Sequence, residues 1–382
     1  MNSRERVFCT INHREPDRVP VGEFGIDHDH VSNILGRHSF WRNRKDTTIA
    51  LWEGRRDEVV ESLKQDYAEL VDRLDYDVVT VPLCPSNNAW QGPPPKMIAE
   101  GVWEDREGRI YQYAPSNDSI MCMSRSEAKE SLNPDDIQKA IESMSAIDES
   151  VFELVDYFGD RFGKERAVLF RDMDVYNILM EPFGGDFLHQ MIVFSEAEDD
   201  LLALQDGVVN YNRLLTEHCA KHNVSIMMQG ADFCMNTGPF FSPLIFRKIF
   251  LPLMKRVNAD IAGFGMTSFF HCCGNTGKIL DDFIDAGYRG YQSIQVSAGM
   301  DNGEVKKKYG RKLTLWTGVQ CETLIRGSIK EISLEVAEAL ETLMPGGGFI
   351  FGSTNTVQFG ANTDNYLRAL DLVREKGNYH NL

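Results

Sequence analysis

The chain has 382 residues, with 57 acidic against 40 basic side chains and a formal net charge of −17. Such a charge excludes a broad nucleic-acid surface, because that surface requires clustered basic residues. It also disfavours a substrate with many negative charges unless arginines gather locally. The length allows one large domain or two ordinary ones, no apolar run is as long as a membrane span, and the N-terminus lacks a hydrophobic signal core. We therefore expect a cytoplasmic protein without a membrane partner.

Short apolar runs alternate with amphipathic helical stretches along the chain. The strands are predicted over residues 19–24, 76–83, 167–172, 224–230, 266–271, 290–295, 312–318 and 348–353. Helices are predicted over residues 48–74, 199–222, 275–286 and 330–343, and a further helix start at Ser242-Pro243. This alternation predicts an α/β protein with a (β/α)8 TIM barrel. A doubly wound open sheet is the competing fold, but no G-x-G-x-x-G motif follows the first strand.

We interpret residues 1–382 as a single barrel domain with two additions. Residues 1–18 and 27–47 do not fit the alternation and are predicted to form an N-terminal extension. Residues 84–115 follow the second strand and contain a predicted hairpin with its turn near Gly108. Because loops that follow barrel strands surround the barrel mouth, this insertion is expected to lie over the mouth.

A histidine and two adjacent cysteines, His271-Cys272-Cys273, stand at the end of the fifth predicted strand. Active sites of such barrels lie at the carboxyl ends of the strands. Side chains alternate along a strand, so His271 and Cys273 share a face while Cys272 points away. Cys321 follows the seventh strand, on the same rim. Two thiolates and an imidazole suit Zn²⁺ and leave its fourth position open, as in a catalytic site.

Two other interpretations of these sulfurs remain open. Free cysteines are commonly buried small hydrophobic residues. The adjacent pair could also be redox-active, although adjacent cysteines form a disulfide only with strain. In the reducing cytosol we do not expect the eight cysteines to form a disulfide framework. The position of Cys321 on the rim that carries His271 and Cys273 favours the zinc site.

Further candidate site residues stand near predicted strand ends. Glu23 and Asp232 are candidate catalytic carboxylates, acting as a fourth zinc ligand, an orienting group or a proton donor. A solvent-exposed rim carboxylate or a helix cap is the alternative for each. Asn355 is a candidate for substrate binding or for capping the next helix. An aromatic substrate would suit a pocket of aromatic side chains, for which the candidates are Phe24, Tyr176 and Phe241, although such residues more often belong to a core.

Four segments resemble those of the uroporphyrinogen decarboxylase superfamily, whose members fold as (β/α)8 barrels. They are residues 4–21, residues 238–252, the H-C-C-G-N sequence at 271–275, and residues 355–366. His271, Cys273 and Cys321 match, residue by residue, the H-x-C and distant cysteine of the zinc-dependent methyltransferases in this superfamily. The decarboxylases instead carry an arginine-rich segment after the first strand, where residues 22–31 of this chain contain no arginine.

The resemblance implies an enzyme that moves a methyl group between a small methylated substrate and the cobalamin of a separate corrinoid protein, with Zn²⁺ as cofactor. An aryl methyl ether is the favoured substrate, because residues 51–67 and 102–113 resemble the demethylating enzymes. Transfer from a methylcobamide to a thiol such as coenzyme M, a uroporphyrinogen decarboxylase-like lyase and a non-enzymatic zinc-binding barrel are the alternatives. The base-off signature D-x-H-x-x-G is absent, so the cobalamin is expected on a partner protein docked over the barrel mouth. A homo-oligomer is compatible with the sequence.

Overall fold

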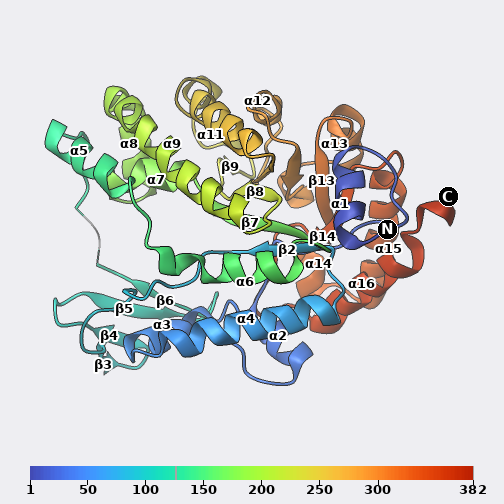
Figure 1. The fold of residues 1–382 in the computed structure, drawn as a ribbon, viewed down its shortest axis with the longest axis horizontal. Coiled ribbons are helices and arrows are strands. Elements are labelled where there is room, and N and C mark those ends of the chain that lie inside the picture. Colours follow the sequence, from blue (N-terminus) through green and yellow to red (C-terminus); the bar gives the residue numbers. More distant parts are fainter. Residues whose placement is uncertain (125–126, 382) are drawn as a thin grey trace.

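The computed structural model describes residues 1–124 and 127–381. Seven parallel strands form one curved sheet in the order β14-β13-β12-β11-β8-β7-β2 (Figure 1). Each strand lies inside a predicted run or exceeds it by one residue. Their bounds are β2 (Val78–Val81), β7 (Ala167–Met173), β8 (Ile226–Gln229), β11 (Thr267–His271), β12 (Gly290–Gln292), β13 (Thr314–Val319) and β14 (Phe349–Ser353).

The first predicted strand closes this sheet through two isolated bridges. Val21 bridges Phe351 of β14, and Gly22 bridges Val78 of β2, both in parallel. Two reasons keep the pairing short. Pro20 has no N–H to donate to a ladder, and a Cβ on Gly22 would lie 2.7 Å from the Cβ of Val78. Residues 21–22 therefore take the eighth place in the ring, and the fold is the TIM-barrel type that the alternation predicted.

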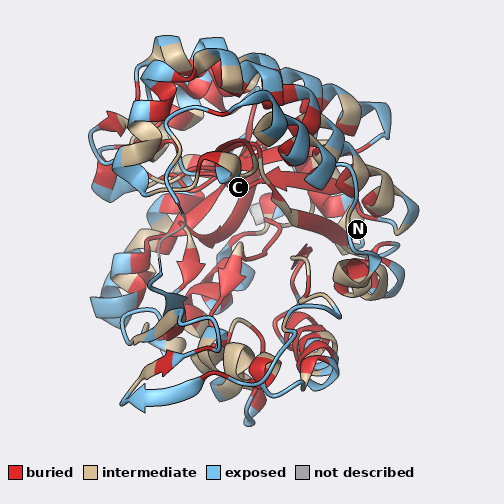
Figure 2. Cartoon of the chain, turned by 90° about the vertical axis from the view of Figure 1, so that its left-hand side faces the viewer, coloured by how far each residue is buried: buried red, intermediate tan, exposed pale blue. Residues whose placement is uncertain are grey.

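Helices cover the outside of the sheet (Figure 1). Their bounds are α2 (His28–Leu35), α3 (Arg44–Trp52), α4 (Arg56–Arg73), α5 (Pro134–Ser143), α6 (Glu153–Phe162), α7 (Tyr176–Met180), α8 (Phe187–Glu196), α9 (Glu198–Lys221), α10 (Pro243–Ile245), α11 (Leu251–Gly263), α12 (Leu280–Asp285), α13 (Asn302–Tyr309), α14 (Cys321–Arg326), α15 (Ile329–Leu343) and α16 (Thr363–Lys376). Figure 2 shows the buried residues concentrated on the central strands and the exposed ones on the outer helix faces.

Two predicted helices differ from the observed ones. The helix predicted over residues 48–74 is two helices, α3 and α4, because Gly54 has φ of +74° and interrupts the helical path. The helix predicted over residues 275–286 begins only at Leu280. The Asn275 side chain instead holds a loop, accepting from the Gly277 amide at 3.2 Å and donating to the Ala298 carbonyl at 3.0 Å.

The N-terminal residues close the barrel at the amino ends of its strands. Helix α1 (Ser3–Ile11) packs Val7 and Ile11 against the inner apolar cluster that includes Leu169 and Trp316. Arg6 joins this helix to the start of β2, because its Nη1 lies 2.6 Å from Oδ1 of Asp77. Residues 1–18, predicted as an extension, thus form one end of the barrel core.

The predicted insertion is a small antiparallel sheet of four strands in the order β3-β4-β5-β6. The expected hairpin is the β4-β5 pair, with Gly108 at φ +79° in its turn. The sheet continues to Cys122, beyond the predicted end at residue 115, and its strands are β3 (Lys96–Ala99), β4 (Val102–Glu104), β5 (Ile110–Ala114) and β6 (Ser119–Cys122). Short two-residue pairs complete the strands: β1 (Gly25–Ile26) with β15 (Thr356–Val357), and β9 (Cys234–Met235) with β10 (Gly238–Pro239).

Two further expectations concern cysteines and membranes. All eight cysteines are free thiols, and none is paired in a disulfide. Within residues 1–124 and 127–381, no helix combines the length and the apolar composition that crossing a membrane requires.

Candidate metal centre at the barrel mouth

Three potential metal ligands meet where β11 ends. The sulfur of Cys273 lies 3.6 Å from Nε2 of His271. Asp232 follows β8, and its Oδ1 lies 3.7 Å from the same Nε2 and accepts a hydrogen bond from the Cys273 amide at 2.7 Å. The ligand atoms of these residues all lie within 4.8 Å of one another. The loop requires glycine at position 274, because φ is +81° and a Cβ would lie 2.7 Å from the Cys234 carbonyl oxygen.

Gln292, at the end of β12, orients the imidazole of His271. The Gln292 Nε2 donates to the Ser353 carbonyl at 3.0 Å, so its Oε1 faces the histidine and accepts from Nδ1. The Nδ1 proton leaves a lone pair on Nε2, directed toward Cys273 and Asp232. Burial alone would lower the pKa of His271, but the Cys273 thiol and the Asp232 carboxylate hold it above its ordinary value. The ring is thus prepared to bind a cation at Nε2.

The sulfur of Cys273 has its own partners. Asn355 Nδ2 donates to this sulfur at 2.9 Å, and Ser293 Oγ lies 3.5 Å from it. Both groups can donate to a thiolate, which is the form of cysteine that binds metal. Ser293 has φ of +83°, a sparsely populated conformation for a residue with a side chain. The predicted substrate residue Asn355 therefore contacts the candidate metal ligand directly.

The two adjacent sulfurs have different surroundings, as the alternation of side chains predicted. Cys272 is fully buried, and its sulfur accepts a hydrogen bond from the Phe233 amide at 3.3 Å. Burial raises the pKa of Cys272 well above its ordinary value. Cys272 is thus a packing residue, held as a thiol, while Cys273 faces the site.

Cys321 lies on the predicted rim, at the start of α14, but outside the group of three. Its sulfur lies 3.6 Å from Oγ1 of Thr354 and 3.5 Å from the carbonyl oxygen of Thr356. Burial raises the pKa of this thiol to about 12. The structure therefore brings two of the three predicted zinc ligands together and adds Asp232. Ligation by Cys321 stays a prediction, because it requires that sulfur to turn away from the two threonines.

Glu23 lies behind the wall of the site. Its side chain is buried and accepts hydrogen bonds from the Ser353 amide at 3.0 Å and the Ser353 hydroxyl at 2.6 Å. Burial raises the pKa of Glu23 to about 8. The Tyr366 hydroxyl, which pairs with Tyr76, is a further neighbour of this carboxyl. Its predicted catalytic role stays a prediction.

A cavity of about 500 Å³ opens beside the three ligands. His271, Asp232 and Asn355 line it, together with Phe24, whose ring stacks on the His271 imidazole at 4.2 Å and 6°. The insertion contributes Ser116 and Asn117 to the same wall, as expected of a segment near the mouth. Sequence reasoning missed two other lining residues, Arg42 and Arg44, because they lie just before and at the first residue of α3 and not at a strand end.

Two predicted pocket residues lie elsewhere. Tyr176 and Phe241 are buried in an aromatic cluster around Phe250, with ring centroids 5.8 Å and 5.5 Å from that ring. The Tyr176 hydroxyl donates to Gln190 Oε1 at 2.7 Å. Neither residue is among those that line the cavity beside His271. The structure therefore places them in the core between β8 and the outer helices, and their predicted contact with substrate stays a prediction.

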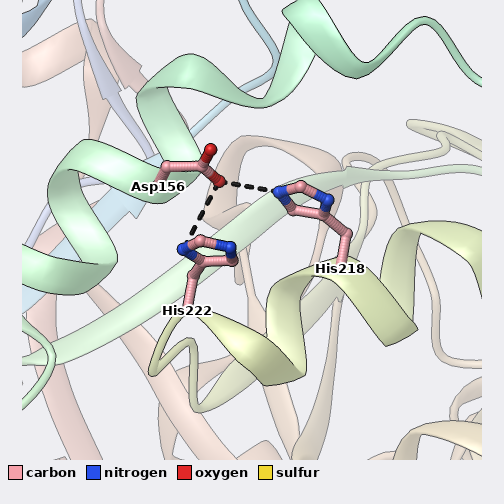
Figure 3. A group of neighbouring side chains, drawn as sticks. All are labelled: Asp156, His218 and His222. Atoms are coloured by element: carbon pink, nitrogen blue, oxygen red, sulfur yellow. Dashed lines mark hydrogen bonds and ion pairs between the residues drawn. The ribbon is translucent and has the colours of Figure 1, made fainter.

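A second group of potential ligands lies on the outer helices α6 and α9 (Figure 3). Asp156 Oδ1 is 2.7 Å from Nε2 of His218 and 3.6 Å from Nδ1 of His222. The two histidine rings stack with centroids 4.9 Å apart, and Phe152 stacks on His218 at 3.8 Å. Sequence reasoning did not single out this group, although histidines four apart on a helix share a face.

A known protein family matches the part of the chain that carries the candidate metal centre. The family model described as Uroporphyrinogen decarboxylase (URO-D) matches residues 190–376, which include Asp232, His271 and Cys273. The match confirms, over these residues, the resemblance of the motifs to the uroporphyrinogen decarboxylase superfamily.

Solved structures extend the likeness to the whole fold. A methyltransferase from Methanosarcina mazei is 14% identical, with a TM-score of 0.67 over 98% of this chain and 99% of that chain. A sugar phosphate isomerase/epimerase from Parabacteroides distasonis is 11% identical, but its TM-score of 0.32 over 68% of this chain and 97% of that chain is too low to support an argument. No curated protein matches the sequence.

Proposed function

We propose that this protein is a methyltransferase that moves a methyl group between a small methylated substrate and the cobalamin of a separate corrinoid protein. The favoured reaction is the demethylation of an aryl methyl ether. The observation that supports it is the group of Asp232, His271 and Cys273 at the carboxyl ends of the barrel strands, two of whose members, Asp232 and His271, line a cavity. That is the place where barrels of this type carry out chemistry.

The donor set fits Zn²⁺. Imidazole nitrogen, thiolate sulfur and carboxylate oxygen are all common zinc ligands. The Gln292 contact directs Nε2 of His271 toward Cys273 and Asp232, and Asn355 donates a hydrogen bond to the sulfur of Cys273. His271 and Cys273 would hold the ion, and Cys321 or Asp232 would complete the protein ligands. When bound, Zn²⁺ supplies a Lewis acid that stabilises negative charge on an ether oxygen or a thiol sulfur.

The remaining residues of the cavity bind and orient the substrate. The ring of Phe24, held parallel to the His271 imidazole, offers an apolar face to an aromatic ring. Asp232 lines the cavity with a side chain that is 54% exposed, so it can relay a proton from solvent to a departing phenolate oxygen if it is not a zinc ligand. Attack on the methyl carbon requires the cobalamin of the partner to approach the cavity, which we expect from the barrel mouth beside Ser116 and Asn117.

The alternatives differ in what fills the cavity. A thiol substrate would use the same metal ligands, so the donor set supports either direction of methyl transfer. A decarboxylase for tetrapyrroles is less well supported, because two arginines in the cavity wall cannot pair with the many carboxylates of that substrate.

The decisive experiment supplies the missing partners. Zinc-loaded protein is mixed with a reduced corrinoid protein, or with free cob(I)alamin, and a panel of methoxyarenes, and the cobalamin spectrum is followed. We expect methyl-cob(III)alamin to form with at least one ether, and none with His271→Ala. If no ether methylates the cobalamin while methyl-cob(III)alamin plus a thiol is demethylated, the reaction runs in the thiol direction. If purified protein binds no stoichiometric zinc, the proposal is wrong.

A further inference from the structure

Three arginines gather at the cavity of a chain whose net charge is −17. Arg42 and Arg44 line the cavity. Arg171 stands behind its wall on β7, where Nη1 donates to the Phe24 carbonyl at 3.3 Å and the guanidinium lies 5.6 Å from the Phe24 ring centroid. The decarboxylases' arginine-rich segment is absent after the first strand, and these arginines reach the mouth from two other segments.

The neighbouring carboxylate, Asp27, does not use all of the N–H donors of Arg44. Asp27 Oδ1 lies 2.7 Å from Nε of Arg42 but 3.7 Å from Nη2 of Arg44, which is beyond a hydrogen bond. Arg44 Nη1 instead donates to a neutral group, the Asn117 carbonyl, at 3.1 Å. Arg44 therefore keeps guanidinium N–H groups for a ligand, on a side chain that is 41% exposed.

Arg171 adds a buried donor. Its Nε is buried and has no hydrogen-bond partner among the described residues, and the Asp172 carboxylate lies 3.6 Å away. The nearby Asp118 carboxylate is already engaged, by Nε2 of His28 at 2.8 Å and the Tyr113 hydroxyl at 2.7 Å. Burial and the charge of Arg42 lower the pKa of Arg171 to about 10, and the same causes lower the pKa of Arg44. The positive charges thus repel one another, and an anion between them would relieve the repulsion.

The arginines and the candidate metal centre share the wall of one cavity. Phe24 contacts both, because its ring stacks on His271 and lies beneath Arg171. Arg42 Nη2 lies 3.4 Å from Oγ1 of Thr356, the residue after Asn355, which itself donates to the sulfur of Cys273. A ligand anchored at the arginines would therefore extend to the metal ligands within a space of about 500 Å³, which suits a single aromatic ring with its substituents.

We propose that Arg42 and Arg44 bind a carboxylate on the substrate, so that the substrate class is a methoxylated aromatic carboxylate and not a neutral ether. Arginine presents planar paired donors that match a carboxylate, and a partly enclosed site strengthens that contact. The methoxy part of this inference rests on the proposed function, whereas the binding of the aromatic carboxylate does not.

Calorimetric titration with benzoate and benzamide tests the anion site without any methyl transfer. We expect zinc-loaded protein to bind benzoate about tenfold more tightly than the neutral amide, and Arg44→Gln to remove most of that preference. Arg213→Gln is the matched control, because Arg213 is an exposed arginine on α9 that pairs with Glu217. Arg42→Gln is harder to interpret, because it also removes the shorter ion pair of Asp27, a carboxylate in the cavity wall.

Each outcome has a defined meaning. Equal binding of the two ligands, binding of neither, or a preference that survives in Arg44→Gln would overturn the inference. Thermal unfolding of each variant checks that its fold is intact. The proposed function is tested separately with para-methoxybenzoate and para-methoxybenzamide. Selective benzoate binding without methylation of cobalamin by either ether would contradict the methyltransferase and leave the anion site standing.

Discussion

Two groups of residues each bring three potential ligand atoms within 4.8 Å of one another. One is the candidate centre at the barrel mouth, and the other is the Asp156-His218-His222 group on the outer helices, which Figure 3 shows. Their surroundings differ. At the mouth, His271 is 5% exposed, and Gln292 binds its Nδ1, so that Nε2 faces Cys273 at 3.6 Å and Asp232 at 3.7 Å. On the outer helices, the side chains of His218 and His222 are 15% and 27% exposed, and Nε2 of His218 is already bound to Asp156.

The difference shows that close ligand atoms do not by themselves make a metal site. In the outer group, His218 and Asp156 form a short hydrogen bond of 2.7 Å, whereas Nε2 of His271 lies 3.6 Å from the Cys273 sulfur and 3.7 Å from Asp232. The outer pair is therefore satisfied without a cation. Acidic neighbours add to it, with Glu149 3.4 Å from Nδ1 of His218 and Asp160 3.9 Å from Nδ1 of His222. At the mouth, Gln292 holds His271 and Asn355 donates to the sulfur of Cys273, while His271 and Asp232 line a cavity.

The largest expected effect separates the two groups by their zinc. His271→Ala is expected to lose stoichiometric zinc and all methyl transfer, because it removes a ligand held in place by Gln292. His218→Ala, its counterpart on α9, is expected to retain both. Metal analysis after dialysis and the cobalamin assay measure the outcome. Zinc that depends on His218 and not on His271 would reverse the comparison.

A second substitution decides which residue completes the centre. Cys321→Ser is expected to lose zinc, because we propose this sulfur as the third ligand despite its contacts with Thr354 and Thr356. Cys219→Ser, at a fully buried cysteine of α9, serves as the control and should retain zinc. If Cys321→Ser retains zinc and Asp232→Asn loses it, Asp232 is the third ligand.

The orienting contact behind His271 gives a graded effect. Gln292→Ala removes the acceptor of the Nδ1 proton and is expected to weaken zinc affinity about 10- to 100-fold, as measured by competition with a chelator. Gln190→Ala, which removes the partner of the Tyr176 hydroxyl outside the centre, should leave the affinity unchanged. An unchanged zinc affinity in Gln292→Ala would mean that Gln292 fills space in the core and does not orient His271 for the metal.

A buried carboxyl at the mouth should make stability depend on pH. The pKa of Glu23 is raised from 4.5 to about 8 by burial, so the folded protein keeps a proton that the unfolded chain loses. The free energy of unfolding should therefore fall as pH rises from about 4.5 to about 8. In Glu23→Gln this fall should be smaller, and in the exposed control Glu130→Gln it should persist. Denaturant unfolding of zinc-free protein across this range measures the slope, and equal slopes in both variants would refute the assignment.

The smallest effect concerns the outer group itself. His218→Ala breaks the hydrogen bond to Asp156 and the stacking on Phe152, and should lower the free energy of unfolding by about 1 kcal/mol. Denaturant unfolding measures this loss. If added zinc stabilises wild-type protein more than His218→Ala, so that the difference between their free energies of unfolding grows, the outer group is a metal site.

Much of the barrel was predictable because buried parallel strands must be apolar on both faces. Every strand of the main sheet, from β2 to β14, lies in a run that this rule selects or exceeds that run by one residue. A second local rule, the alternation of side chains along a strand, predicted that Cys272 and Cys273 point in opposite directions. This rule needs no knowledge of the fold. The break between α3 and α4 was missed because the apolar periodicity of the sequence continues across Gly54, although its φ of +74° ends the helical path.

The sequence alone predicted the barrel, the rim that carries His271, Cys273, Cys321 and Asp232, and the resemblance to the superfamily, because these depend on local patterns and ordered motifs. Only the tertiary structure decided which of those rim residues meet. It placed Asp232 beside His271, turned Cys321 toward two threonines, and brought Arg42 and Arg44 to one cavity with Arg171 behind its wall. Such contacts join loops that are distant in the chain, and side-chain direction there is set by packing and hydrogen bonds that no local spacing encodes.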